Sequence, residues 1–244
     1  MKRMSPRHHG MQRILLLAAA GAIAYFIGFV STRPAPAQQP ERFDMKVRED
    51  FFAGFSGDAE RLARGMKTCE QVLAANSKDP YALVWHGGGL MVEAGQAFQA
   101  GDQQKGMDLW TRGLKEMQTA VDLEPDNPGV RIPRGAVLLA SSRFLPSPEM
   151  GRPLVTDGVA DYEHTYEVQK PYFETLGTHP RGELLFGLAE GYSRLGDQSK
   201  AQLYFEKIKT DLPNTAYAKR ADAWLTTKTL AANQTGCVGC HVSK

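Results

Sequence analysis

The chain has 244 residues, with 29 Lys and Arg against 27 Asp and Glu, which gives a formal net charge of +2. Five of the basic residues and none of the acidic ones fall within the first 37 residues, so the remainder carries 24 basic and 27 acidic residues, or −3. Because the positive charge belongs mainly to the leader, no basic face is left for nucleic acid, and a nucleic-acid-binding protein is excluded.

The N-terminal segment has the charge and hydropathy pattern of an export signal. Met1 to Arg13 contains four basic residues and no acidic one, and an uncharged run of 17 residues follows from Ile14 to Val30. A positive flank before an apolar run is typical of a secretory signal peptide or a signal anchor, with the rest of the chain exported. We expect residues 1–37 to anchor the chain in the inner membrane, with a periplasmic domain. Cleavage near Ala35-Pro36-Ala37, which would leave a periplasmic protein, stays open.

Residues 38–57 are predicted to be a linker between this segment and the exported body. Pro34, Pro36 and Pro40 disfavour a helix and favour an extended spacer. The aromatic residues that follow are more apolar than a free tether requires. We therefore expect Asp44 to Phe55 to be partly ordered, with its aromatic side chains packed on the first helices.

The exported body, residues 58–232, is predicted to be helical with an internal repeat. Its clearest unit is GELLFGLAEGYSRLGDQSKAQLYFEKIKTDLP, from Gly182 to Pro213. This unit resembles the tetratricopeptide repeat (TPR), a helix-turn-helix element. The residues at the positions of the repeat pattern are Leu185, Leu188, Ala189, Tyr192, Ala201, Phe205, Ile208 and Pro213. The resemblance implies an all-α fold, a solenoid of TPR-like helical hairpins, with a turn at Gly196-Asp197.

Looser copies of this unit precede it. We expect helices over 58–76, from Asp79-Pro80 to Ala100, from the Gly101-Asp102 turn to Leu123, and from Asn127-Pro128 to about Arg143. Residues 144–158 contain three prolines and are predicted to form an inserted loop. The next helix is expected over 159–176, kinked or broken by Pro171. A last helix is expected over 217–230, with Trp224 on its inner face.

The C-terminal tail, residues 233–244, contains the sequence Cys237-Val238-Gly239-Cys240-His241. Read as CxxCH, it resembles the haem-attachment signature of the c-type cytochromes. The resemblance implies one haem c bound covalently through Cys237 and Cys240, with His241 as the proximal iron ligand. A zinc site would need a fourth ligand, and a redox dithiol normally belongs to a βαβ pattern that does not precede this motif. A redox dithiol or a metal site formed by this motif stays open as the alternative.

The sixth iron ligand would have to come from the helical body or from a partner, or be absent, because only three residues follow His241. His86 is our first candidate, since the three glycines after it could admit a porphyrin close to the helix surface. The competing interpretation, tight helix–helix packing at Gly87-Gly88-Gly89, is favoured. His179, in a predicted turn, and Met150, in the proline-rich insertion, are the other candidates.

Two classes of function follow from these features. In the first, the chain is an exported, membrane-tethered monohaem cytochrome that transfers electrons and docks to a redox partner protein or membrane complex through the solenoid. In the second, it is a periplasmic TPR scaffold or cytochrome assembly factor whose CxxCH is a redox or metal site. No Ser-His-Asp grouping, carboxylate pair or dinucleotide-binding loop is found, so an enzyme is not expected. Cys69 lies on an apolar stripe and is expected in the core.

Overall fold

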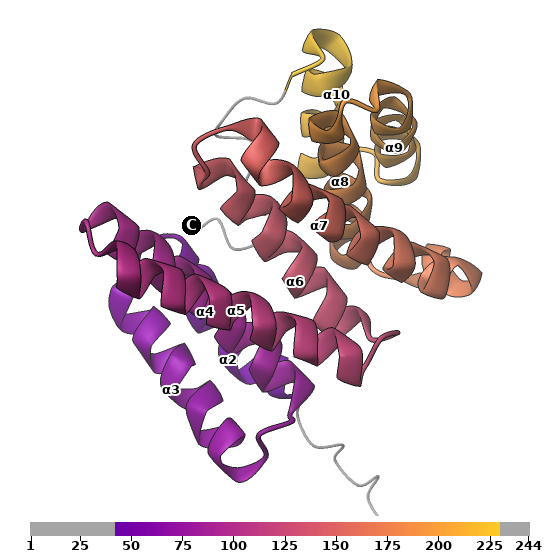
Figure 1. Ribbon diagram of the computed structural model, residues 1–244. Helices are drawn as coiled ribbons and strands as arrows, with labels where there is room; N and C mark the ends of the chain where they lie inside the picture. Colours follow the sequence, from indigo (N-terminus) through magenta and orange to yellow (C-terminus); the bar gives the residue numbers. More distant parts are fainter. Residues whose placement is uncertain (1–41, 230–244) are drawn as a thin grey trace, which may run out of the picture. The chain divides into compact units, whose positions relative to one another are not determined.

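The computed structural model describes residues 42–229, and this part of the chain is all-helical. Helices account for 85% of these residues, and no strand occurs among them. The helices, which follow one another in Figure 1, are α2 Phe43–Phe55, α3 Ala59–Ala75, α4 Pro80–Gln99, α5 Gln103–Leu123, α6 Pro128–Ser141, η2 Ser142–Phe144, α7 Pro148–Gln169, η3 Lys170–Thr175, α8 Thr178–Leu195, α9 Gln198–Asp211 and α10 Ala216–Thr227. The predicted all-α class is confirmed.

Polar caps and prolines determine where most of these helices begin. A side-chain oxygen before the helix accepts a hydrogen bond from a backbone N–H of the first turn, which would otherwise be unpaired. The residues that cap α3, α4, α5 and α9 in this way are Asp58, Asp79, Asp102 and Asp197. Pro80 and Pro128 take the first positions of α4 and α6, where no N–H is needed. The helix starts predicted at Asp79-Pro80 and Asn127-Pro128 are confirmed.

Glycine makes two of the turns between paired helices. Gly101 and Gly196 have φ angles of 84° and 87°, a left-handed conformation that L side chains rarely adopt. Each glycine is followed directly by the aspartate that caps the next helix. The turns predicted at Gly101-Asp102 and Gly196-Asp197 are therefore confirmed.

Consecutive helices pack in pairs: α2 with α3, α4 with α5, α6 with α7, and α8 with α9. The first helix of each pair also contacts the first helix of the next, so that α2, α4, α6, α8 and α10 adjoin in series. This repetition of helical pairs gives the solenoid-like arrangement that Figure 1 shows.

The buried apolar side chains of the described residues form two clusters, and neighbouring residues of α6 belong to different ones. The first cluster includes Phe51 and Met117 and extends to Leu138. The second starts at Leu139 and includes Trp224. Adjacent residues of α6 thus belong to different clusters, so α6 contributes to both.

Helix α2 lies in the segment that was predicted to be a linker. Phe51 is fully buried, and its ring centroid lies 5.3 Å from that of Trp85 on α4, so the expected packing of the aromatic residues is confirmed. Asp50 pairs with Arg61 at 2.9 Å and with Arg64 at 2.6 Å, which ties α2 to α3. The prediction of an extended spacer is wrong for residues 43–55, because the prolines that suggested it all precede this helix.

The prediction of an inserted loop over residues 144–158 is also wrong, because α7 begins at Pro148. Ser147 caps this helix, and proline at the first helical position leaves no hydrogen bond unmade. Pro153 lies inside α7, where it removes one backbone hydrogen bond without ending the helix. The break expected at Pro171 is confirmed, since α7 ends at Gln169 and a 3₁₀ helix follows.

Among residues 42–229, no helix is both long and apolar enough to cross a membrane. The run from Ile14 to Val30, on which the membrane-anchor prediction depends, lies outside this described part of the chain. The anchor and the export of the body therefore stay predictions.

Candidate functional site

The residues predicted to bind haem, Cys237, Cys240 and His241, lie outside the described residues. Their donor atoms suit a c-type haem, with two thiols for the vinyl groups and one imidazole for the iron. Within residues 42–229, no group of three or more His, Cys, Asp or Glu side chains could hold a metal ion. The haem site stays a prediction that depends on the motif itself.

The described chain ends next to α9 and α10, just before the tail. Lys228 has a left-handed backbone with φ of 57°, and its N–H donates to the carbonyl oxygen of Trp224 at 2.6 Å. The Lys228 ammonium lies 4.7 Å from the centroid of the Trp224 ring and 3.1 Å from Oε1 of Gln202 on α9. These contacts define the point from which the residues after Thr229 continue.

His86, the first candidate for a distal iron ligand, is buried between three helices, with 1% of its side chain exposed. Its Nδ1 lies 2.5 Å from Oε2 of Glu116 on α5, and Nε of Arg112 donates to the other carboxylate oxygen at 2.8 Å. Its Nε2 lies 3.9 Å from Oε1 of Glu70 on α3. Iron ligation by His86 stays a prediction; in the described structure the ring joins α3, α4 and α5.

The three glycines after His86 lie where helices approach closely. A Cβ atom added to Gly87 would lie 2.8 Å from the carbonyl oxygen of Gly113 on α5. A Cβ atom added to Gly89 would overlap Sδ of Met66 and would lie 2.9 Å from the ring of Phe51. The interpretation of this stretch as tight helix–helix packing is confirmed, and neighbouring atoms of α2, α3 and α5 fill the space beside it.

The Glu116 carboxylate should make stability depend on pH. Burial raises the pKa of Glu116, but the hydrogen bond from His86 and the pairing with Arg112 outweigh burial and hold the pKa below its ordinary value of 4.5. A carboxylate whose pKa is lower in the folded state than in the unfolded state stabilises the fold at pH values above its unfolded-state pKa. This stabilisation is lost as the pH falls through the folded-state pKa. Glu116→Gln should therefore cost about 1.5–3 kcal/mol near neutral pH.

The measurement is urea unfolding of the wild type and of Glu116→Gln between pH 7 and pH 3. The difference in unfolding free energy should shrink as the pH falls below about 4.5. Glu60→Gln, at an exposed position of α3, serves as the control and should stay within about 0.5 kcal/mol of the wild type. If the difference in unfolding free energy between the wild type and Glu116→Gln did not change with pH, this carboxylate would not be stabilised in its ionised form.

The other residues singled out in the sequence lie on different helices. His179 is half-buried in the first turn of α8, with Nδ1 3.1 Å from the hydroxyl of Tyr217, so its predicted place in a turn is wrong. Met150 lies in the first turn of α7 and is 55% exposed. Cys69 is fully buried in α3, where burial raises the pKa of its thiol, and its expected place in the core is confirmed.

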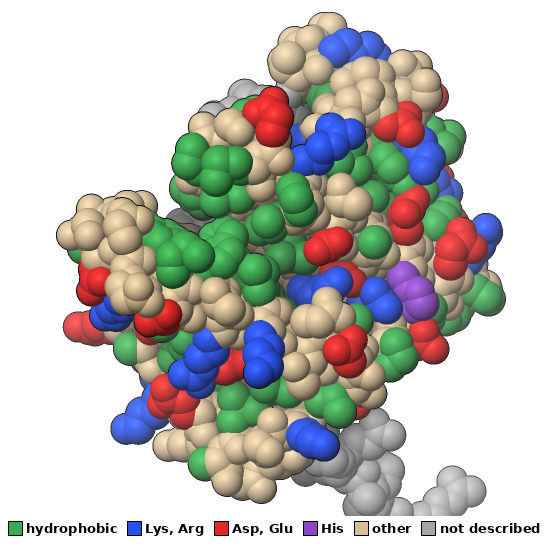
Figure 2. All heavy atoms as spheres, viewed as in Figure 1, with side chains coloured by type: hydrophobic (Ala, Val, Ile, Leu, Met, Phe, Trp, Pro, Cys, Tyr) green, Lys and Arg blue, Asp and Glu red, His purple; other side chains and the backbone are tan. Residues whose placement is uncertain are grey.

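An exposed apolar surface lies at the end of the α6–α7 hairpin, and sequence reasoning missed it. Phe144 is 80% exposed at the end of η2, and it is joined by Pro146 and Met150, which are also exposed. We call these three residues the apolar tip. Hydrophobic side chains gather over this end of the hairpin in Figure 2. The proline-rich sequence around Phe144 was the only signal, and it was interpreted as a loop.

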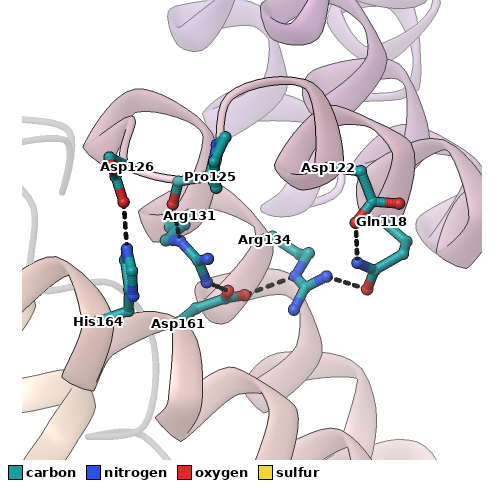
Figure 3. A network of polar contacts seen from close by, with 8 residues as sticks. All are labelled: Gln118, Asp122, Pro125, Asp126, Arg131, Arg134, Asp161 and His164. Atoms are coloured by element: carbon teal, nitrogen blue, oxygen red, sulfur yellow. Dashed lines mark hydrogen bonds and ion pairs between the residues drawn. The ribbon is translucent and has the colours of Figure 1, made fainter.

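A buried polar network, also missed in the sequence, joins α5, α6 and α7 (Figure 3). The carboxylate of Asp161, 0% exposed, accepts hydrogen bonds from Nη1 of Arg131 at 2.8 Å and from Nε of Arg134 at 2.6 Å. Arg134 also donates to Oε1 of Gln118. Burial raises the pKa of Asp161, and the two guanidinium groups oppose that rise. Arg134 and Gln118 also line a groove of about 290 Å³ over α6.

No family model, curated protein or solved structure matches this chain.

Proposed function

We propose that this chain is an exported, membrane-anchored monohaem c-type cytochrome that transfers electrons, with a TPR-like helical body that docks it to a redox partner. The observation that carries the proposal is the spacing of Cys237, Cys240 and His241 at the end of the chain. Two thiols separated by two residues can reach the two vinyl groups on one edge of a porphyrin, and the next histidine then falls beneath the iron.

A bound haem would supply a one-electron iron couple. The chain's own residues would have three tasks. The two thiols would hold the haem, His241 would ligate the iron, and the helical body would keep water from the exposed face of the haem. The motif supplies two thiols and an imidazole, and these five residues cannot by themselves enclose a macrocycle. We therefore assign the covering surface to the helical body or to a partner.

The packing of the last repeat supports the TPR-like part of the proposal. The residues of the repeat pattern that are buried in α8 and α9 are Leu185, Leu188, Ala189, Tyr192, Ala201, Phe205 and Ile208. Small side chains at Ala189 and Ala201 allow two helices to approach closely, while Phe205 stacks on Trp224 of α10 with ring centroids 4.5 Å apart. Each pair thus buries its apolar face against the next, as solenoid repeats do.

The test is to replace Cys237 and Cys240 together by Ala in the full exported chain. The haem stain that survives denaturing electrophoresis should disappear, while the helical circular-dichroism signal should stay within about 10% of the wild type, because solenoid stability depends on packing between repeats. Cys69→Ala is the matched control, since it removes a buried thiol from α3 and should leave the haem stain intact. Unfolding of the double variant would instead make the motif structural and favour a scaffold with a metal site or disulfide.

A further inference from the structure

The apolar tip exposes large side chains on a segment that the body holds firmly. Phe144 is the most exposed large hydrophobic residue of the described part of the chain. Its neighbour Ser142 is buried, with its hydroxyl donating to the carbonyl oxygen of Leu139 at 2.7 Å. Isolated apolar side chains are common on protein surfaces, but grouped ones on an ordered segment mark a surface that another group covers.

The tip is attached to the C-terminal turn of α8. Arg194 donates from Nη1 to the carbonyl oxygen of Leu139 and from Nη2 to the hydroxyl of Ser142, both at 2.7 Å. From the other side of the tip, Arg152 of α7 donates to the carbonyl oxygen of Leu195 at 3.3 Å. Arg143 pairs with the buried carboxylate of Glu190, also on α8. Both flanks of the apolar tip are thus bound to the same end of α8.

The last turn of α10 binds the same end of α8. Nε1 of Trp224 donates to the hydroxyl of Ser193 at 2.9 Å, and Ser193 directly precedes Arg194. Trp224 is also the residue over which Lys228 lies, one residue before the described chain ends. The consecutive residues Ser193 and Arg194 of α8 therefore contact the end of α10 and the flank of the tip, so both lie at the C-terminal end of α8.

The tail is long enough to bring its motif to the tip. Seven residues lie between Thr229 and Cys237, so the two are eight Cα–Cα steps apart, and eight extended steps span at most about 26–29 Å. The tip and α10 both pack on α8, and packed helix axes are about 8–10 Å apart, so the two lie within about 20 Å of one another. The tail can therefore reach the tip without any rearrangement of the body.

We infer that the segment after Thr229, which includes the C-terminal tail, docks on the apolar tip, and that Phe144 and Met150 cover the exposed face of its haem. This inference rests on the proposed function for the identity of the covered group. A porphyrin presents a large apolar face that water would otherwise contact, and an aromatic ring beside a thioether is an apolar surface suited to it. The tip is an exposed apolar surface, and it is bound to the same end of α8 as the last turn of α10.

The first experiment places the photoreactive amino acid p-benzoylphenylalanine at Phe144 in the full exported chain. Illumination should crosslink position 144 to a residue between 230 and 244 of the same chain, identified by peptide mass spectrometry. The same amino acid at Met45, which is 43% exposed on α2, is the control and should give no such crosslink. Crosslinks between two chains, or only to residues of the body, would overturn the docking.

The intact mass of each illuminated sample separates this inference from the proposed function. A haem-loaded chain without the crosslink contradicts the docking and leaves the cytochrome proposal standing. A chain without haem that still gives the crosslink contradicts the cytochrome proposal and supports tail docking alone. A chain with neither contradicts both.

A second experiment measures how accessible the haem is. Phe144→Ser combined with Met150→Ser should raise the rate of carbon monoxide binding to the ferrous protein about tenfold, because the loss of two apolar contacts shifts the docked population by at least that factor. The matched control, Met45→Ser with Leu123→Ser, removes two exposed apolar side chains outside the tip and should leave the rate unchanged. Equal rates in the two double variants would contradict a covering role for the tip.

Discussion

Replacing Asp161 by Ala is expected to lower the free energy of unfolding by about 3–5 kcal/mol, because it breaks a buried ion pair from one side. Asp161 is the shared acceptor of Arg131 and Arg134, which come from the preceding helix α6. Its removal leaves the guanidinium of Arg134, a side chain only 10% exposed, without its carboxylate partner. Urea unfolding followed by circular dichroism measures the loss.

Asp157→Ala is the matched control for this variant. Asp157 lies one helical turn earlier on α7, is exposed, and should change the unfolding free energy by no more than about 0.5 kcal/mol. Because the network joins α5, α6 and α7 where the two apolar clusters divide, its loss should also reduce the cooperativity of unfolding. If Asp161→Ala lowered the unfolding free energy as little as Asp157→Ala does, the network would not stabilise the packing of α5, α6 and α7.

Alanine substitutions at two glycines of α4 should change the unfolding free energy in opposite directions. At Gly87 a methyl group would meet the carbonyl oxygen of Gly113 and Cγ of Met117, each at 2.8 Å, so α4 and α5 would have to separate. Overpacking of this kind costs about 1–3 kcal/mol, beyond the helix propensity that alanine brings. The unfolding free energy of Gly87→Ala, measured in urea, should fall accordingly.

Gly95→Ala, two turns further along the same helix, is the control. A Cβ atom there would have no neighbour within 4 Å, so the variant gains helix propensity without a clash. It should raise the unfolding free energy by up to about 1 kcal/mol. If both variants moved in the same direction, close packing at Gly87 would not be the reason for glycine at that position.

Local signals in the sequence were sufficient for most of the helical boundaries. Aspartate after glycine marks both the Gly101 and the Gly196 turns, and the helix starts at Pro80 and Pro128 follow from the same local chemistry. The prediction of a loop over residues 144–158 was wrong because its prolines were interpreted as helix breakers without regard to their position in the helix. Pro148 stands at a helix start, where proline is favoured.

Long-range pairings could not be inferred from local signals. Glu116 lies 30 residues after His86, and nothing in either neighbourhood indicates that the two side chains meet inside the fold. The same holds for Asp161, whose partners lie on another helix. The exposure of Phe144 likewise depends on how η2 attaches to α8, and this is a property of the tertiary structure. By contrast, the haem prediction follows from five consecutive residues and needs no fold.

The mass of the C-terminal tryptic peptide, purified with export intact, tests the central claim most directly. Cleavage after Lys228 releases Thr229 to Lys244, which contains both motif cysteines. Each thiol adds across one vinyl group without loss of atoms, so the peptide should gain the whole mass of one haem, with both cysteines resistant to alkylation. A peptide at its unmodified mass with two alkylatable thiols, or two hydrogens lighter as a disulfide, would contradict the assignment of this chain as a c-type cytochrome.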